Sequence, residues 1–345
     1  MKILYGVQAT GNGHITRARV MAPALQQQGI EVDYLFSGRE PEKLFNMEPF
    51  GNYQVRKGLT FVVEDGSVRR LKTVLSNNVL RLIRDIRQLD LSEYDLVISD
   101  FEPVSAWAAK LQNKPCIGIA HQYAFRYPIP GPEVGGIMMP AIRFFAPVQQ
   151  GIGLHWHHFN GPILPPLIEP QNYPVSEQAG MILVYLPFES REQIRRWLEP
   201  LQGYEFHVYC DIQKPEEDGH ILWRPLSRSG FQEAQARCAG VIANCGFGLS
   251  SEVLQAGKKL LTKPLAGQPE QVSNAAVLEH LGLAEVFEDL TPQQFYDWAD
   301  QPSPEPVTYP DVASALARWI AEGCEQTPEQ LAQQLWQDTE QSYSV

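Results

Sequence analysis

The chain opens with KILYGVQATGNGHITR, residues 2 to 17, which joins a short apolar run to a glycine loop and then to a helical pattern. Glycines at positions 11 and 13 permit backbone conformations that a Cβ would forbid. The apolar run is typical of a buried strand, and the residues after the loop have helical spacing. This stretch therefore predicts a strand, a tight turn and a helix, with His14 in the first helical turn.

The alternation of strands and helices continues along the whole chain, which predicts parallel sheets covered by helices on both faces. Candidate strands in the first half are residues 2–7, 32–36, 54–63, 95–100, 115–120 and 151–157, with helices near 14–28, 69–89, 103–112 and 138–149. Candidate strands in the second half are 181–187, 205–210, 220–226, 240–245 and 259–265, with helices near 190–201, 230–238, 249–256, 270–281, 291–300, 310–322 and 327–342.

A proline-rich stretch separates the two halves, because the prolines between residues 159 and 180 rule out a continuous helix or a central strand there. The predicted fold class is α/β, with two tandem doubly wound, Rossmann-like domains facing a central cleft. The expected boundaries are an N-terminal domain at 1–160, a linker at 161–180, a C-terminal domain at 181–326, and a final helical segment, 327–345, that packs back on the N-terminal domain.

Composition narrows the class of protein. The 28 Lys and Arg residues against 40 Asp and Glu residues give a net charge of −12, which argues against general nucleic-acid binding. The five cysteines are scattered and lack the paired spacing of a zinc site or a disulfide framework. Because no long apolar segment is present, we expect a cytoplasmic protein, with contact at the inner face of a membrane left open.

A second glycine loop lies in ANCGFGLSSEVLQAG, residues 243–257. A strand ending at Cys245 leads through glycines into a helical pattern, so the free N–H groups of that helix face the carboxyl edge of the sheet and form an anion site. Ser250 and Ser251 are placed to add hydroxyl donors, and Glu252 to accept hydrogen bonds from ribose hydroxyls. The donor site predicted from this loop comprises Gly246, Phe247, Gly248, Leu249, Ser250, Ser251 and Glu252, with Gly13 facing it.

Together with the strand that ends at Pro264 and the following Gln- and Glu-rich turn, this loop resembles the MurG-like and UDP-glycosyltransferase group of GT-B glycosyltransferases. The resemblance implies that the helix N-terminus holds the donor diphosphate and that Glu252 holds the ribose. It also implies that Gln268, Glu270 and Gln271 bind the sugar, with Gln271 the best aligned. The implied donor is a nucleotide sugar, most simply a UDP-sugar, bound as a co-substrate with no cofactor.

The first loop supplies the expected base. In the resembling enzymes a histidine at this place acts as, or near, the catalytic base, and an acidic residue after a later strand orients it. His14 and Asp100 occupy the matching positions. The alternatives are that His14 packs the first helix and that Asp100 caps the helix beginning near Pro103. Glu102 is a reserve candidate, and Arg17 is placed either to reach a phosphate or to form an ion pair.

Weaker signals bear on metals and on the acceptor. HWHHF, residues 155–159, suggests metal ligands, but a third ligand is missing and no DxD motif is present, so we expect no catalytic metal. His121, Gln122 and Tyr123 are candidates for the acceptor pocket. The basic amphipathic pattern at 68–90 and the apolar stretch at 134–148 leave open a lipid-linked acceptor, a glycan acceptor or peripheral membrane contact.

The sequence therefore predicts an inverting glycosyltransferase with His14 as general base. Two rivals stay open. One is a GT-B-fold UDP-sugar epimerase, which needs more carboxylates around the sugar than Glu270 alone. The other is a non-catalytic protein that binds nucleotide sugars.

Overall fold

The computed structural model describes residues 1–60, 63–64, 67–68, 77–131, 140, 142–337 and 339. The described elements of the N-terminal half are β1 (Lys2–Gln8), α1 (Asn12–Gln27), β2 (Glu31–Ser37), η1 (Pro41–Lys43), η2 (Glu48–Phe50), β3 (Tyr53–Arg56), β4 (Val63–Glu64), β5 (Ser67–Val68), α3 (Val79–Gln88), β6 (Leu96–Asp100), α4 (Pro103–Leu111), β7 (Cys116–Ala120), η3 (His121–Arg126), β8 (Gln150–Leu154) and β9 (Ile163–Leu164).

The described elements of the C-terminal half repeat the same plan. They are β10 (Met181–Tyr185), α6 (Arg191–Leu198), β11 (Glu205–Cys210), β12 (Glu216–Asp218), β13 (Ile221–Pro225), α7 (Arg228–Arg237), β14 (Gly240–Asn244), α8 (Phe247–Gln255), β15 (Lys259–Lys263), α9 (Pro269–His280), β16 (Glu285–Val286), α10 (Pro292–Ala299), α11 (Val312–Ala321) and α12 (Pro328–Gln337).

Each half is built on one seven-stranded sheet, and the two strand orders match. The first sheet runs β3-β2-β1-β6-β7-β8-β9 and the second β12-β13-β11-β10-β14-β15-β16. The pairs in both sheets are parallel except for the antiparallel edge pair β12–β13. Without β12 the second sheet has the doubly wound order 3-2-1-4-5-6, and the first sheet has the same order with β9 added as a seventh strand, which confirms the predicted fold class.

Close packing of helices on the central strands explains a glycine inside β1. A Cβ at Gly6 would lie 2.0 Å from the Ser105 hydroxyl of α4 and 2.9 Å from a Glu102 carboxylate oxygen. The strand around it is continuously buried, as expected for a parallel strand covered on both faces. Gly6 thus allows α4 to approach β1, and the ends of β1 and β6 lie side by side.

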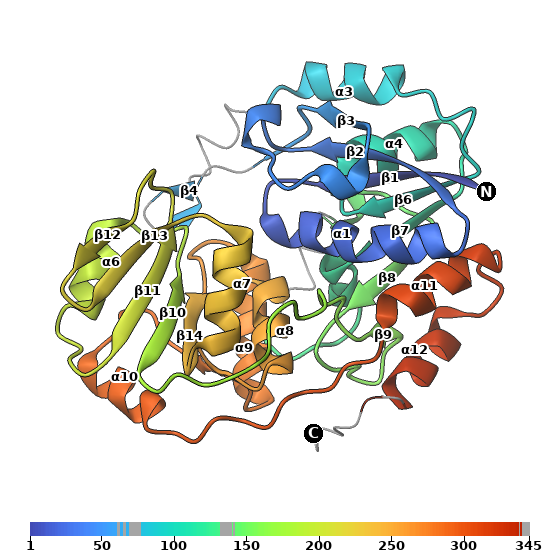
Figure 1. Ribbon diagram of the computed structural model, residues 1–345. Helices are drawn as coiled ribbons and strands as arrows, with labels where there is room; N and C mark the ends of the chain where they lie inside the picture. Colours follow the sequence, from blue (N-terminus) through green and yellow to red (C-terminus); the bar gives the residue numbers. More distant parts are fainter. Residues whose placement is uncertain are drawn as a thin grey trace.

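The last helices return to the N-terminal domain, as Figure 1 shows at its right-hand side. Helix α11 packs on α1, and α12 packs on β9. The Trp336 indole of α12 donates a hydrogen bond of 2.6 Å to the Ile163 carbonyl. The return therefore begins with α11, before the expected boundary at 327, and β9 places the end of the first sheet inside the segment expected to be linker, 161–180.

Several predicted elements differ in extent. The strand expected at 151–157 ends at Leu154, so His155 and His157 do not share a strand face. The strand expected at 54–63 ends at Arg56. Of the expected helix at 69–89, only the part from Val79 is described, and Val79 is 58% exposed instead of lying on the buried face. Parts of 68–90, 134–148 and 327–342 lie outside the described residues.

Two features of the described residues concern the membrane and the cysteines. Among these residues, no helix combines the length and the apolar character that crossing a bilayer requires. All five cysteines are free thiols, and three of them are buried.

Candidate active site

Each sheet has a point where its strand order reverses. In a doubly wound sheet, ligands bind outside the carboxyl ends of the strands at this switch point. In the first sheet the switch point lies between β1 and β6. The loop after β1 leads to His14, and β6 ends at Asp100. In the second sheet the switch point lies between β10 and β14, and β14 leads to the loop before α8. The two candidate loops thus occupy equivalent places in the two domains.

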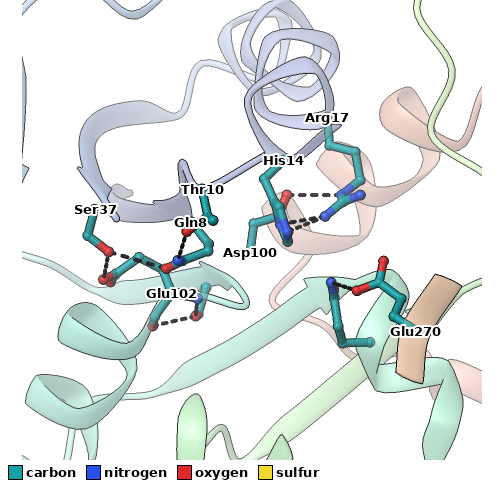
Figure 2. A network of polar contacts seen from close by, with 10 residues as sticks. Gln8, Thr10, His14, Arg17, Ser37, Asp100, Glu102 and Glu270 are labelled. Atoms are coloured by element: carbon teal, nitrogen blue, oxygen red, sulfur yellow. Dashed lines mark hydrogen bonds and ion pairs between the residues drawn. The ribbon is translucent and has the colours of Figure 1, made fainter. Parts of the chain in front are cut away.

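His14, Asp100 and Arg17 form one polar cluster, shown in Figure 2. The His14 Nδ1 lies 2.7 Å from Asp100 Oδ1. Arg17 donates from Nε to Asp100 Oδ2 at 3.0 Å and from Nη2 to Oδ1 at 2.6 Å. The Asp100 side chain is fully buried, that of Arg17 is 5% exposed, and that of His14 is 15% exposed. The structure therefore brings the predicted pair together and adds a buried arginine.

The ionisation of Asp100 follows from these neighbours. Burial alone would raise the pKa of this carboxyl, but the charges of Arg17 and His14 and their hydrogen bonds outweigh burial, so the pKa is lowered. Asp100 is thus an anion at neutral pH, able to orient the imidazole. Arg17 is ion-paired, which is one of its two predicted arrangements.

Glu102, the reserve candidate, has a structural role instead. Its carboxylate accepts hydrogen bonds from the Val104 and Ser105 amides at 2.8 and 2.6 Å and so caps α4. It also accepts the Ser37 hydroxyl at 2.6 Å, and Figure 2 shows this network beside the His14 cluster. The capping function considered for Asp100 therefore belongs to Glu102, which leaves Asp100 to face His14.

Helices α1 and α8 begin without a side-chain cap. The N-cap residues are Gly11 and Gly246, and neither helix has a capping hydrogen bond from a side chain. In contrast, α3, α4, α6, α7, α9, α10 and α11 are each capped by a side chain. A Cβ added to Gly248 would lie only 3.7 Å from the Cα of Gly13. The first turns of these two helices, both without a side-chain cap and with positive partial charge, therefore lie against each other at the domain boundary.

The first turn of α8 is partly occupied by the N-terminal domain. Phe247 is 4% exposed, and its ring stacks on His121 with centroids 4.0 Å apart. The Ser251 hydroxyl accepts a hydrogen bond from the Trp156 indole at 2.8 Å and donates to the Phe247 carbonyl at 2.7 Å. The side chains of Phe247 and Ser251 thus pack between the domains.

The other residues of this turn remain near the domain boundary. Gly246, Gly248 and Leu249 are partly exposed, whereas Ser250 is 1% exposed with a hydroxyl that has no hydrogen-bond partner. The structure therefore leaves the backbone of this turn, more than its hydroxyl groups, as the part of α8 that can meet an anion.

Glu252 lies among charged side chains from three segments. Burial, and next the charge of Glu169, raise its pKa to about 7, while Gln235, Arg228 and Arg19 act in the opposite direction. Arg19 belongs to α1, so this carboxyl is close to the N-terminal domain. Glu169 is itself held by Arg228 and by Gln232. Glu252 is thus a carboxyl poised near neutral pH at the edge of the domain boundary.

The turn before α9 places its three predicted residues differently. Gln268 caps α9 by accepting the Gln271 amide at 2.8 Å, and Gln271 accepts the Leu265 amide at 2.9 Å and is buried. Glu270 instead extends across the boundary and accepts a hydrogen bond of 2.9 Å from Gln122. Glu270 therefore faces the His14 cluster from the other domain, as Figure 2 shows, while Gln268 and Gln271 shape the turn.

His121 connects the two domains. Its Nδ1 lies 2.8 Å from the Leu154 carbonyl and its Nε2 lies 2.7 Å from the Asn274 side-chain oxygen. Burial lowers its pKa, and the side chain has no exposed surface. His121 is therefore a packing residue of the domain boundary and is not open to an acceptor.

The histidines after β8 belong to no group of candidate metal ligands among the described residues. Within the described ranges, no group of three or more His, Cys, Asp or Glu side chains is arranged to hold a metal ion. His155 is fully buried and accepts the Trp156 amide at its own Nδ1.

Two features of the site escaped sequence reasoning. The Gln122–Glu270 contact joins residues 148 positions apart, and the fork of Arg17 on Asp100 depends on how deeply α1 is buried. The missing caps on α1 and α8, in contrast, are visible in the sequence, because Gly11 and Gly246 stand where Ser, Thr, Asp or Asn would be usual.

Comparison with solved structures gives the class of protein. The chain resembles LpCGTa in complex with UDP, at 13% identity and a TM-score of 0.58, with 97% of each chain covered. It also resembles VinC in complex with dTDP, at 14% identity, TM-score 0.53 and 98% and 99% coverage of the two chains. MurG from Acinetobacter baumannii matches at 16% identity, TM-score 0.52 and 96% and 94% coverage. The fold is that of the GT-B glycosyltransferases.

The family follows from the sequence model. The model described as glycosyl transferase family 1 matches residues 1–133 and 156–301, most of the chain. The protein belongs to this family of glycosyltransferases. A search of curated protein sequences finds no significant match.

Proposed function

We propose that this glycosyltransferase transfers a sugar from a nucleoside diphosphate sugar to an acceptor hydroxyl with inversion at the sugar C1. The observation that supports the proposal most strongly is the pair of uncapped helix ends, α1 and α8, whose first turns lie against each other near His14. The positive ends of both helices favour an anion bound beside them. A diphosphate has the charge and the oxygen atoms that such a pair of helix ends can bind.

In the proposed reaction, the acceptor oxygen attacks C1 of the donor sugar as the bond from C1 to the diphosphate oxygen breaks. The electron pair of that bond leaves with the nucleoside diphosphate, and the acceptor proton passes to Nε2 of His14. The Nδ1–H of His14 donates to Asp100, whose charge stabilises the imidazolium that forms. The amides of α8 stabilise the leaving diphosphate, in the way that a divalent cation does elsewhere.

The donor we propose is a UDP-sugar. Glu252 would accept hydrogen bonds from the ribose hydroxyls. Glu270, which here accepts a hydrogen bond from Gln122, would accept one from a sugar hydroxyl instead. Two of the similar folds were solved with UDP and dTDP, which supports a pyrimidine nucleoside diphosphate. Because GT-B sites of this kind rely on backbone amides, we expect EDTA to leave turnover unchanged.

For the acceptor, we propose a lipid-linked molecule or a glycan at a membrane surface. Helix α3 presents Val79, Leu80 and Ile83, which are 58%, 81% and 39% exposed. Arg81, Arg84 and Arg87 lie exposed on the same short helix. Apolar side chains next to cations are typical of helices that lie on anionic membranes, and this surface stands out in a chain of net charge −12.

The decisive experiment replaces Gly246, the N-cap of α8. Its backbone already has the extended conformation of an N-cap, and a Cβ there would meet nothing within 4 Å. In Gly246→Asp the new carboxylate caps the amides itself and repels a diphosphate, whereas Gly246→Ala adds only a methyl group. We expect UDP to raise the melting temperature of the wild type and of Gly246→Ala, and to have no effect on Gly246→Asp.

Two results would contradict the proposal. One is equal stabilisation of Gly246→Asp and wild type by UDP, because the diphosphate would then bind elsewhere. The other is a wild type that no nucleoside diphosphate or nucleotide sugar stabilises. If UDP-sugars bind, UDP release by wild type and by His14→Gln separates an enzyme from a binding protein. An enzyme releases UDP and loses this turnover with the substitution, whereas a binding protein releases no UDP in either form.

A further inference from the structure

Arg17 contacts both members of the proposed catalytic pair. Its guanidinium holds Asp100 through two nitrogen atoms, and the same Nη2 that lies 2.6 Å from Asp100 Oδ1 also lies 2.7 Å from Nδ1 of His14. His14 Nδ1, Asp100 Oδ1 and Arg17 Nη2 therefore form a triangle with sides of 2.6 to 2.7 Å. Orientation of an imidazole by a carboxylate alone does not require this third group.

The triangle has a consequence for hydrogen bonding. Nδ1 of a neutral imidazole either carries a hydrogen, and then donates to Asp100, or has a lone pair, and then accepts from Arg17. Only the first arrangement leaves the lone pair on Nε2, where a general base needs it. The position of the guanidinium relative to Nδ1 thus affects whether His14 can accept a proton from a substrate.

The triangle has a second consequence for charge. When His14 gains a proton, the imidazolium lies beside the carboxylate of Asp100, which favours it, and beside the guanidinium of Arg17, which disfavours it. Both partners are almost fully buried, so solvent screens these interactions little. Burial opposes the charge of Arg17, but Asp100 outweighs burial and raises the pKa of the guanidinium above its usual range, so Arg17 stays charged.

Other groups around the pair do not replace this charge. Tyr5 of β1 is close to Asp100 and Arg17, and burial raises the pKa of its hydroxyl so far that it is neutral. Glu270 of α9 adds a negative field at Arg17 from the opposite domain, and His121 of η3 is held by Leu154 and Asn274. Within the described residues, Arg17 is the cation that lies within 2.7 Å of both Nδ1 of His14 and Oδ1 of Asp100.

We infer that Arg17 is a positioning residue that holds Asp100 toward His14 and, through its charge beside Nδ1, opposes the gain of a proton by His14. This inference rests on the proposed function for its catalytic meaning. Its physical content, the effect of one buried cation on the protonation of His14, is independent of which reaction the enzyme catalyses.

The test follows the protonation of His14 directly. The ring C–H signals of His14 are recorded by NMR as a function of pH, with His14→Gln used for assignment. In Arg17→Met the like charge is gone, so we expect the titration midpoint of His14 to rise by about one unit or more, the size typical of a charge at this distance. Arg17→Lys keeps the charge, and its midpoint should stay within about half a unit of wild type.

Controls separate charge from folding. Arg237→Met removes an arginine from the surface of α7, half-exposed and paired with Glu233, and should leave the His14 midpoint unchanged. Because removal of one partner of a buried pair destabilises a fold, each variant is first melted, and Arg17→Gln, whose amide can still donate to Asp100, replaces Arg17→Met if the latter is unfolded.

Turnover then gives the second readout. With a UDP-sugar, the acidic limb of the kcat/KM profile of Arg17→Met should move to higher pH by the same amount as the NMR midpoint. Arg17→Lys should lose about tenfold or more in kcat without a shift of the limb, because one ammonium cannot reproduce the fork. A midpoint that stays or falls in the neutral variant overturns the inference. A midpoint that rises while wild type turns over no nucleotide sugar refutes the proposed function alone.

Discussion

At the scale of single residues, Asp100 combines a structural and a chemical role. It is the buried partner of Arg17, and it faces the histidine that we propose as the base. Because the carboxylate lies at the end of β6, next to β1, its position follows from strand order and not from loop conformation. Substitution of Asp100 should therefore affect both the stability of the fold and turnover. The effect on stability is identified by its dependence on pH.

We predict that Asp100→Asn lowers the free energy of unfolding by about 3 kcal/mol or more at neutral pH, since it leaves Arg17 buried without its anion. The pKa of Asp100 in the folded protein is below the ordinary value of 3.8, so its contribution is present above that pH and is lost as pH falls through the folded pKa. The stability gap between wild type and variant should narrow below about pH 4. Urea unfolding at pH 7 and pH 2.5 measures this gap, and an equal gap at both would contradict the ion pair.

Glu252 has the opposite dependence. Its pKa of about 7 in the folded protein is above the ordinary 4.5, because the fold favours the protonated carboxyl. The free energy of unfolding therefore falls as pH rises from 4.5 to about 7. Glu252→Gln should be more stable than wild type at pH 8 and equal to it near pH 4. If the carboxylate accepts ribose hydroxyls, UDP should stabilise wild type more at pH 8 than at pH 6, and the variant equally at both. Thermal melts with and without UDP decide, and a pH-independent UDP effect on wild type would exclude Glu252 from the ribose site.

The sequence predicted the contact of His14 with Asp100 because both follow strands whose ends meet at one sheet edge. It did not predict the commitment of Ser251 to Trp156 or of Gln271 to the Leu265 amide. Those contacts depend on which side of a helical turn faces the other domain. A shift of one residue along the helix brings a different side chain to that side. A motif gives the position of a residue along the chain, whereas the free or engaged state of its side chain depends on packing.

At the scale of elements, buried strands were predictable and edge elements were not. The strands at the sheet centres contain apolar runs, such as LVI at residues 96–98 and VIA at residues 241–243. β12 has the sequence EED, whose charges give no strand signal, and it forms only by pairing antiparallel with β13 at the sheet edge. The same limit applies to α3, where Val79 fits the apolar period but lies outside the packed face.

Helix α3 carries the prediction at this scale. Wild type should sediment with vesicles that contain anionic phospholipid, and Leu80→Asp with Ile83→Asp should reduce binding about tenfold or more, because two apolar side chains then no longer enter the bilayer. The matched control is Val175→Asp, which changes an apolar side chain that is 49% exposed in the proline-rich segment. Equal binding of the double variant and wild type would show that this surface does not meet lipid.

At the scale of the whole molecule, the two domains share one return segment. Helix α11 packs on α1 and follows directly from the C-terminal half of the chain, so the cores of the two domains are mechanically connected. Leu316 of α11 is fully buried in an apolar cluster that includes residues of both halves of the chain. The predicted layout of two tandem domains is confirmed by the two sheets. The packing of α11 on α1 is a separate feature, which depends on the apolar faces of these two helices.

We predict that Leu316→Ala lowers the free energy of unfolding by about 2 to 5 kcal/mol, the range for a large apolar side chain removed from a packed core. Unfolding followed by tryptophan fluorescence should change from one transition to two, since the contact that couples the domains is weakened. Val175→Ala, on an exposed side chain, should change stability by less than about 0.5 kcal/mol. Two transitions in the wild type itself would contradict the coupling.

The return of the C-terminal helices also bears on how the chain is made. During synthesis the N-terminal sheet and α1 leave the ribosome before α11, the helix that packs on α1, has been made. The packing of the first domain is thus completed only after the second domain has been translated. A ribosome that stalls within the second half would release a nascent chain with an open apolar surface, a natural substrate for chaperones.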